Sequence, residues 1–235
     1  MEQNEMNTIE CRDLVVKRGN FTLGPVNLNI EKGEIFCILG RTGSGKTVFL
    51  ETLAGFYDKK YEGEIVIHGK NRGFVYQDSG LFPHMTVEKN ISYGLRMNRV
   101  DKKTIEEKVR DITEILSISN IRKQYPATVS GGERQRAALA RTLVMDPDII
   151  FMDEPFSALD PATCKKMYEE IRRIHKKFKC TIIFVTHDFR EAQHLADRVG
   201  VMLNGKLRTI VRAEELFTVQ HEEDVKEFLG GVQHE

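Results

Sequence analysis

One short segment constrains the fold of this chain more than any other: Gly40 to Thr47 read GRTGSGKT. The segment fits the pattern GxxxxGK[ST], follows the apolar run Glu34–Leu39 (EIFCIL), and precedes a helical pattern at Val48–Leu53. A strand, glycine-rich turn and helix in this order form a loop whose backbone N–H groups surround phosphates at a helix N-terminus. A glycine-rich turn that only ends a strand is the alternative, and the matching flanks disfavour it.

We expect this loop to bind the phosphates of a nucleotide. Lys46 would bridge the β- and γ-phosphates, and the Thr47 hydroxyl would ligate Mg²⁺. The nucleotide contacts expected from the loop are Gly40, Arg41, Thr42, Gly43, Ser44, Gly45, Lys46, Thr47 and Val48.

Two further apolar runs, Ile149–Met152 (IIFM) and Thr181–Val185 (TIIFV), have the same continuous character as EIFCIL. Such runs are typical of strands buried on both faces of a parallel sheet, and each precedes a turn and a helical pattern, as in βα units. Asp160 and Pro161 predict the N-cap and first turn of a helix that reaches about Phe178. From residue 86 to about residue 145 only helical spacing is found, which predicts an inserted helical subdomain.

The two ends of the chain have different patterns. The first thirty residues alternate in strand-like runs at Thr8–Lys17 and Phe21–Ile30. Gly200–Ile210 predicts a hairpin that turns at Asn204-Gly205, and Ala213–Leu229 predicts a helical tail.

Composition excludes several classes of protein. The 35 basic and 35 acidic residues balance, whereas a dedicated nucleic-acid binder needs a basic excess. No apolar run approaches the ~18 residues that span a bilayer, and the polar N-terminus MEQNEMNTIE is not a signal peptide. The four cysteines lack CxxC spacing, so we expect reduced thiols in a cytosolic protein rather than a zinc site.

A carboxylate pair, Asp153 and Glu154, follows directly after the second buried run. The carboxyl end of such a strand lies at the same sheet edge as the phosphate-binding loop. We expect Asp153 to hold Mg²⁺ through water and Glu154 to polarise the attacking water as a general base. An isolated pair of this kind is usually a solvated strand end, but the phosphate loop and Pro155 favour the functional interpretation.

A second glycine-containing turn, Ser130-Gly131-Gly132-Glu133, opens the helical run Arg134–Val144. A capping box accounts for the serine and the glutamate, but not for two first-turn glycines, each of which costs ~1 kcal/mol relative to alanine. Bare backbone at a helix N-terminus suits a phosphate. Because the Gly40 loop already surrounds one γ-phosphate, the two elements can share it only if they come from different molecules.

Together these motifs resemble the nucleotide-binding subunit of an ATP-binding cassette (ABC) transporter. The run Val129–Leu143 (VSGGERQRAALARTL) is similar to the signature motif of that family, and the resemblance covers about residues 8–230. It implies an α/β fold: a P-loop NTPase (RecA-like) core at residues 8–84 and 146–230, with an N-terminal antiparallel β-subdomain and an α-helical subdomain at 85–145. It also implies a head-to-tail dimer of two copies that encloses two ATP molecules with Mg²⁺.

The resemblance implies further residue roles. Gln77, in VYQDSGLFPHMTV, is similar to the lid glutamine that joins the metal site to the helical subdomain. His187, in FVTHD, is similar to the switch histidine on the γ-phosphate, and Ser157–Asp160 (SALD) to the dimer-crossing loop. The implied catalytic residues are Glu154, His187, Lys46 and Gln77; the metal contacts are Thr47, Gln77 and Asp153; the further nucleotide contacts are Ser130, Gly131, Gly132 and Asp160.

The chain departs from the family pattern at the signature motif, at the adenine-stacking position and at His68–Arg72, a surface connection that is shorter than usual. Val129 and Glu133 replace the commoner leucine and glutamine of the signature. The adenine-stacking aromatic usual near residues 17 to 19 is missing, and Lys17 and Arg18 stand there. Phe21 could replace that aromatic or could equally be an inward-facing strand residue.

Gln77–Leu95 resembles importer subunits more than exporters, and GKTVFLETLAG, LFPHMTVEKNISYGL and VMLNGKL resemble molybdate/tungstate importers. This implies uptake of an inorganic oxyanion, with importers of other ions or of sugars as the alternative. A soluble ABC ATPase of translation usually carries two cassettes in one chain, and one of DNA repair a cassette split by a long coiled coil. Neither pattern fits the single, uninterrupted cassette of this sequence. A non-hydrolysing regulatory ATP binder would lack Glu154 or His187, and both are present.

The implied assembly lies at the cytoplasmic face of the cell membrane. There this peripheral subunit would contact a second copy of itself, integral membrane permease subunits and, indirectly, a solute-binding protein, but no nucleic acid. Many importer relatives continue into a regulatory domain that senses the solute. Only Gly230–Glu235 follow the predicted tail, so we expect no solute-sensing brake from this subunit.

Overall fold

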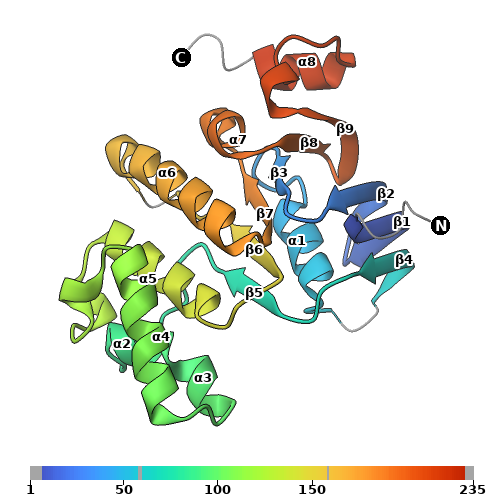
Figure 1. Ribbon diagram of the computed structural model, residues 1–235. Coiled ribbons are helices and arrows are strands. Elements are labelled where there is room, and N and C mark those ends of the chain that lie inside the picture. Colours follow the sequence, from blue (N-terminus) through green and yellow to red (C-terminus); the bar gives the residue numbers. More distant parts are fainter. Residues whose placement is uncertain (1–6, 58–59, 158, 231–235) are drawn as a thin grey trace. The chain divides into compact units, whose positions relative to one another are not determined.

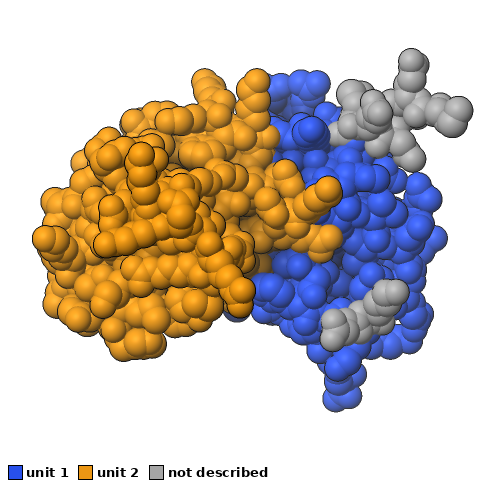
Figure 2. All heavy atoms as spheres, turned by 60° about the horizontal axis from the view of Figure 1, so that its bottom comes forward, with its two compact units in different colours: residues 1–69, 181–235 blue, residues 70–180 orange. Residues whose placement is uncertain are grey.

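The computed structural model describes residues 7–57, 60–157 and 159–230. The structure leaves out residues 1–6 of the polar N-terminus, residues 58–59, Ala158 of the expected dimer-crossing loop and the last five residues of the chain, 231–235. Figures 1 and 2 show the described chain as a ribbon and as two compact units, residues 1–69 with 181–235 and residues 70–180.

The first unit contains the predicted antiparallel strands (Figure 1). β1 (Asn7–Arg18) pairs with β2 (Phe21–Glu31) on one side and with β4 (Tyr61–Ile67) on the other, in the order β2-β1-β4. Alternate side chains in the second half of β2 are buried, namely Val26, Leu28 and Ile30, whereas the residues between them are exposed. The alternation of apolar and polar residues therefore produces a sheet with one buried face.

The parallel strands of the first unit surround β3 (Ile35–Leu39), in which all five side chains are buried. β3 lies between β7 (Thr181–Thr186) and β8 (Arg198–Leu203) and runs parallel to both; β9 (Lys206–Arg212) pairs antiparallel with β8. Because parallel strands end at the same sheet edge, the loop after β3 and the residues after β7 lie together. Two helices, α1 (Lys46–Ala54) and α7 (Phe189–Leu195), pack on β7 and β3 respectively.

The predicted helical tail, Ala213–Leu229, is helical in two separate pieces. The chain forms a 3₁₀ turn, η4 (Ala213–Glu215), and then a separate helix, α8 (Glu223–Gly230). Between these two elements, side chains hydrogen-bond to backbone carbonyls. The His221 ring bonds the Leu216 carbonyl at 2.8 Å, and the Thr218 hydroxyl donates to the Glu215 carbonyl at 3.2 Å. These local bonds compete with the helical ladder and end it.

The second unit contains the predicted helical segment. Two parallel strands, β5 (Arg72–Val75) and β6 (Ile149–Asp153), enclose it in the sequence. The helices between them, and the one after β6, are α2 (Val87–Ile91), α3 (Tyr93–Met97), α4 (Lys102–Ile115), η2 (Ser119–Ile121), η3 (Pro126–Thr128), α5 (Gly131–Leu143) and α6 (Pro161–Phe178). As predicted, Asp160 caps α6, accepting hydrogen bonds from the N–H groups of Ala162 and Thr163. Within the described ranges, no helix combines the length and the apolar character needed to cross a membrane.

Truncation of a core aromatic of the first unit should be strongly destabilising. Phe184 of β7 is fully buried, so we expect Phe184→Ala to lower the free energy of unfolding by about 3–5 kcal/mol. Phe56, after α1, is 47% exposed, and Phe56→Ala should cost less than about 1 kcal/mol. Urea denaturation followed by circular dichroism measures both, and equal losses would contradict the core assignment.

Candidate functional site

The glycine-rich loop between β3 and α1 is set by close approaches of neighbouring backbone and side chains. A Cβ on Gly40 would lie 2.2 Å from the carbonyl oxygen of Met202. Gly45 has φ 102°, and a Cβ there would lie 2.7 Å from the ring of Phe21. Only glycine fits both positions, so the glycines of the motif serve the shape of the loop as well as its open backbone.

The first turn of α1 has the properties of an anion site. Its N-cap, Gly45, supplies no side-chain cap, and the first turn holds no acidic residue within the described helix. The Lys46 side chain is 4% exposed, and its Nζ donates to the carbonyls of Gly40 at 2.9 Å and Arg41 at 3.1 Å. A buried ammonium group and uncapped amides therefore converge on the space enclosed by the loop.

The loop after β7 is tied to the glycine-rich loop inside the same unit. The Gly40 N–H donates to the Thr186 carbonyl at 3.2 Å, which joins the ends of β3 and β7. His187 is the next residue and is exposed, and the Asp188 N–H donates to the Thr186 hydroxyl at 3.0 Å. The predicted switch histidine thus lies at the sheet edge that carries the loop.

The hairpin tip between β1 and β2 supplies two contacts that the sequence left open. The Phe21 ring lies against Gly45 and Gly205, so this side chain packs on the glycine-rich loop. The guanidinium carbon of Arg18 lies 3.3 Å from the ring centroid of Tyr57. The Tyr57 hydroxyl donates to Glu51 of α1, and that hydrogen bond raises the pKa of the phenol. The position of the missing aromatic is therefore occupied by a stacked cation.

In the second unit, the end of β6 carries the carboxylate pair. Asp153 and Glu154 are both half-buried, and Glu154 adopts φ 41°, in the left-handed region that few non-glycine residues occupy. Such backbone strain is concentrated at functional positions. The Gln77 side-chain amide donates to the Ser157 hydroxyl at 3.4 Å, and that hydroxyl donates to the Glu154 carbonyl at 3.0 Å.

The second glycine turn forms the capping box that its sequence predicts. The Glu133 N–H donates to the Ser130 hydroxyl at 3.3 Å, while one Glu133 carboxylate oxygen accepts from the Ser130 N–H at 2.9 Å and its hydroxyl at 2.8 Å. A Cβ on Gly132 would meet the Thr163 methyl group at 3.0 Å. Glycine at this position thus keeps α5 close to the start of α6.

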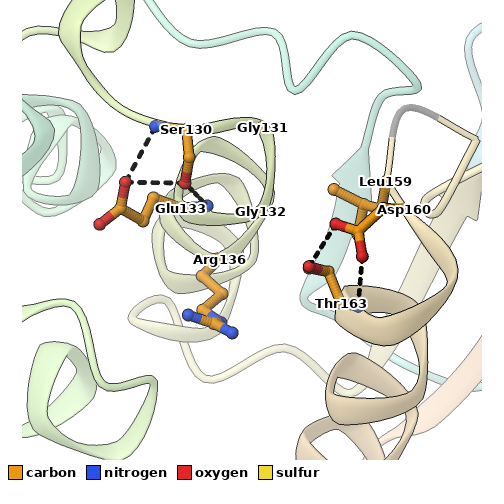
Figure 3. A pocket seen from close by; sticks show the side chains of 8 residues that line it. All are labelled: Ser130, Gly131, Gly132, Glu133, Arg136, Leu159, Asp160 and Thr163. Atoms are coloured by element: carbon orange, nitrogen blue, oxygen red, sulfur yellow. Dashed lines mark hydrogen bonds between the residues drawn. The ribbon is translucent and has the colours of Figure 1, made fainter.

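The turn at Ser130 and the start of α6 line one pocket of about 330 Å³ (Figure 3). Asp160 lies across the pocket from the capping box, and its carboxylate also accepts from the Thr163 hydroxyl at 2.6 Å. The sequence analysis did not include Arg136 and Thr163. Arg136 lies four residues after Gly132 and Thr163 three residues after Asp160, so helical spacing places each on the same helix face as a predicted residue. The lining residues are Ser130, Gly131, Gly132, Glu133, Arg136, Leu159, Asp160 and Thr163.

The predicted residues therefore fall into groups, each described within its own unit. The first unit brings together the glycine-rich loop and His187. The second unit joins Gln77 to the Glu154 loop through Ser157, and separately joins the Ser130 turn to Asp160.

The two capping carboxylates predict how acid affects stability. Hydrogen bonds from the Ser130 N–H and hydroxyl lower the pKa of Glu133 from 4.5, and hydrogen bonds from Thr163 lower the pKa of Asp160 from 3.8. A lowered folded-state pKa contributes stability above the unfolded value that is lost as the pH falls through the folded value. The double variant Glu133→Ala, Asp160→Ala should therefore lose less stability than the parent between about pH 6 and about pH 3. Identical acid unfolding curves would contradict this.

Comparison with known proteins gives consistent similarities. A family profile described as "ABC transporter" matches residues 23–157. The molybdate/tungstate import ATP-binding protein WtpC of Archaeoglobus fulgidus is 44% identical over 224 residues, which cover 90% of this chain and 90% of that protein. WtpC of Thermococcus kodakarensis is 43% identical over 89% of this chain and 66% of that protein. The sulfate/thiosulfate import ATP-binding protein CysA of Halalkalibacterium halodurans is 42% identical over 91% of this chain and 64% of that protein. The chain thus spans about two thirds of the length of several of these relatives.

Solved structures show the same fold. CbiO1 of Clostridium perfringens, part of the ABC transporter complex cbiONQ, superposes with a TM-score of 0.83 at 26% identity, covering 90% of this chain and 91% of that chain. An ATP-binding cassette solved as a dimer in a post-hydrolysis state with ADP and Pi superposes with a TM-score of 0.77 at 26% identity, covering 87% and 98% of the two chains. The α/β fold with a P-loop NTPase core, expected from the sequence, is confirmed.

Proposed function

We propose, on the premise that this chain belongs to the ABC transporter family, that it is the ATP-binding and ATP-hydrolysing subunit of an import system. Residues 8–230 would form one ABC ATPase domain, with 85–145 as its helical subdomain. The observation that carries the proposal is the loop around Lys46: a buried ammonium group, uncapped helix amides and two sterically required glycines form a phosphate cradle.

The first unit would bind the nucleotide. The donor set fits a triphosphate, because the first turn of α1 has no side-chain cap and no acidic residue and the buried Lys46 ammonium adds a positive charge beside it. The Thr47 hydroxyl would ligate Mg²⁺, and the exposed His187 would hydrogen-bond the γ-phosphate. Adenine would lie near the stacked Arg18 and Tyr57, which stand at the position of the usual aromatic.

The second unit would supply the hydrolytic groups. Asp153 and Gln77 would complete the Mg²⁺ shell with hard oxygen ligands, which this cation prefers. Mg²⁺, when bound, neutralises charge that develops on the phosphates. Glu154 would accept the proton of the attacking water. Its left-handed backbone and the hydrogen bond from the Ser157 hydroxyl to its carbonyl would fix the position of its carboxylate, and Gln77 in turn donates to that hydroxyl.

The pocket at Ser130 is best explained by a second copy of the chain. Its glycines and the first amides of α5 would receive the γ-phosphate held by the partner, and Asp160 would lie at the interface. A head-to-tail dimer would then enclose two ATP molecules, separate after hydrolysis, and move integral membrane permease subunits at the cytoplasmic face of the membrane. A solute-binding protein would deliver the solute.

The solute we propose is an inorganic oxyanion, with molybdate or tungstate favoured. Three archaeal WtpC relatives are 40–43% identical, and a fourth is 44% identical. Sulfate is the second candidate, because CysA relatives are 39–42% identical. Molybdate, tungstate and sulfate are all tetrahedral dianions.

Disruption of the gene in its source cells tests this proposal. We expect uptake of radiolabelled molybdate or tungstate to be lost and to be restored by the parent gene but not by Glu154→Gln. Loss of sulfate uptake alone would transfer the assignment to sulfate. If the disrupted cells take up all three anions at the parental rate, and the purified parent protein hydrolyses ATP, the assignment of an oxyanion as the solute is rejected.

A further inference from the structure

The loop that follows Gln77 is held by a guanidinium fork from another element. Arg141, in the last turn of α5, donates from Nη1 to the Gly80 carbonyl at 2.6 Å and from Nη2 to the Ser79 carbonyl at 3.2 Å. Ser79 is buried and has φ 66°, and Gly80 has φ 56°. Two successive left-handed residues are uncommon, and a serine in that region is strained. The two bonds from Arg141 hold both carbonyls of this conformation.

The continuation of the same loop is fixed by a second side chain. Asn90 of α2 is fully buried and accepts from the Phe82 N–H at 2.7 Å. Its amide nitrogen donates at 3.1 Å to the carbonyls of Phe82, Met85 and Thr86. Because Asn90 holds the part from Phe82 onward, the segment that depends on Arg141 is confined to Ser79 and Gly80.

The charge of Arg141 serves this loop. Burial lowers the pKa of the half-buried guanidinium, and among the ion pairs found in the described chain none includes Arg141. Hydrogen bonds from a charged donor are stronger than neutral ones, so the two carbonyls offset part of the desolvation cost. A lysine in its place would keep the charge but not the planar fork.

We propose that Arg141 is a positioning residue for Gln77. Gln77 lies two residues before Ser79, and its amide reaches the Ser157 hydroxyl that contacts the Glu154 carbonyl. Fixing Ser79 and Gly80 therefore fixes the point from which the Gln77 side chain extends toward the Glu154 loop. This role rests on the proposed function, since it acts through the metal-contacting and hydrolytic groups proposed above.

Kinetics of ATP hydrolysis test the role. We expect Arg141→Lys and Arg141→Met to lower kcat about tenfold while KM for ATP changes by less than about twofold. If Arg141 acts through Gln77, the double variant Arg141→Lys, Gln77→Ala should be no slower than Gln77→Ala by more than about twofold. Losses that multiply, or a parental kcat in Arg141→Lys, would overturn the proposal. Arg110→Met, which changes an exposed arginine of α4, is the matched control and should keep the parental rate.

Hydrogen exchange provides a readout that does not depend on hydrolysis. The Ser79 and Gly80 amides bond to the Tyr76 carbonyl and the Asp78 carboxylate. Peptides over residues 78–82 should exchange about tenfold faster in Arg141→Lys, while peptides over α4 should not change. Unchanged exchange at 78–82 would overturn the positioning role, even if Arg141→Met does not fold. If the parent protein does not hydrolyse ATP, the proposed function is rejected. The exchange result then still tests whether Arg141 fixes Ser79 and Gly80.

Discussion

Replacing Glu154 by Gln is expected to slow ATP hydrolysis by about two orders of magnitude or more, because the general base is removed without a change of shape. ATP should still bind, since the phosphate cradle at Lys46 lies on other elements. The uncleaved γ-phosphate should then persist, and an ATP-dependent dimer should accumulate on size exclusion. Phosphate release and the elution volume measure the two effects.

The matched control for that substitution is Glu169→Gln. Glu169 is an exposed glutamate of α6 outside the pocket at Ser130, so its loss of charge should leave hydrolysis near the parental rate. A Glu154→Gln variant that turns over at nearly the parental rate would remove Glu154 from the base role. Loss of ATP binding in that variant would instead indicate a structural role for the strained residue.

Mixing Lys46→Ala chains with Ser130→Arg chains is expected to give mixed dimers with at most one complete ATP site, whereas each variant alone should form no complete site. The reason is that each site takes Lys46 from one chain and Ser130 from the other. Only a mixed dimer then combines an intact Lys46 with an intact Ser130, and it does so at one of its two sites. ATP retained per dimer, measured with both variants in the Glu154→Gln background, reports the number directly.

Ser130→Arg alone checks the composite site from the other side. Arginine cannot form the capping box and fills the pocket between α5 and Asp160. ATP-driven dimerisation should therefore be lost while ATP binding to the monomer is kept. If dimerisation is untouched, the Ser130 turn is a helix cap only.

Local patterns predicted the elements around the candidate site well. The continuous apolar runs became β3, β6 and β7, whose side chains are almost entirely buried. Asp160 and Ser130 cap α6 and α5 as their sequences predict. The tail was predicted less well, because His221 and Thr218 take backbone carbonyls that a continuous helix would use. That competition depends on where the side chains fold back.

The sequence by itself determined the family, the strand–loop–helix context of Lys46 and the residue types that phosphate chemistry requires, because each of these is a property of neighbouring residues. Only the tertiary structure decided which distant groups meet. Phe21 packs on Gly45, and Arg141 holds Gly80 and Ser79, which lie 61 and 62 residues before it in the chain. Such contacts join positions that are far apart in the sequence, so no local pattern predicts them. They form because the interior of a folded chain is closely packed and because a polar group that leaves water must be hydrogen-bonded there.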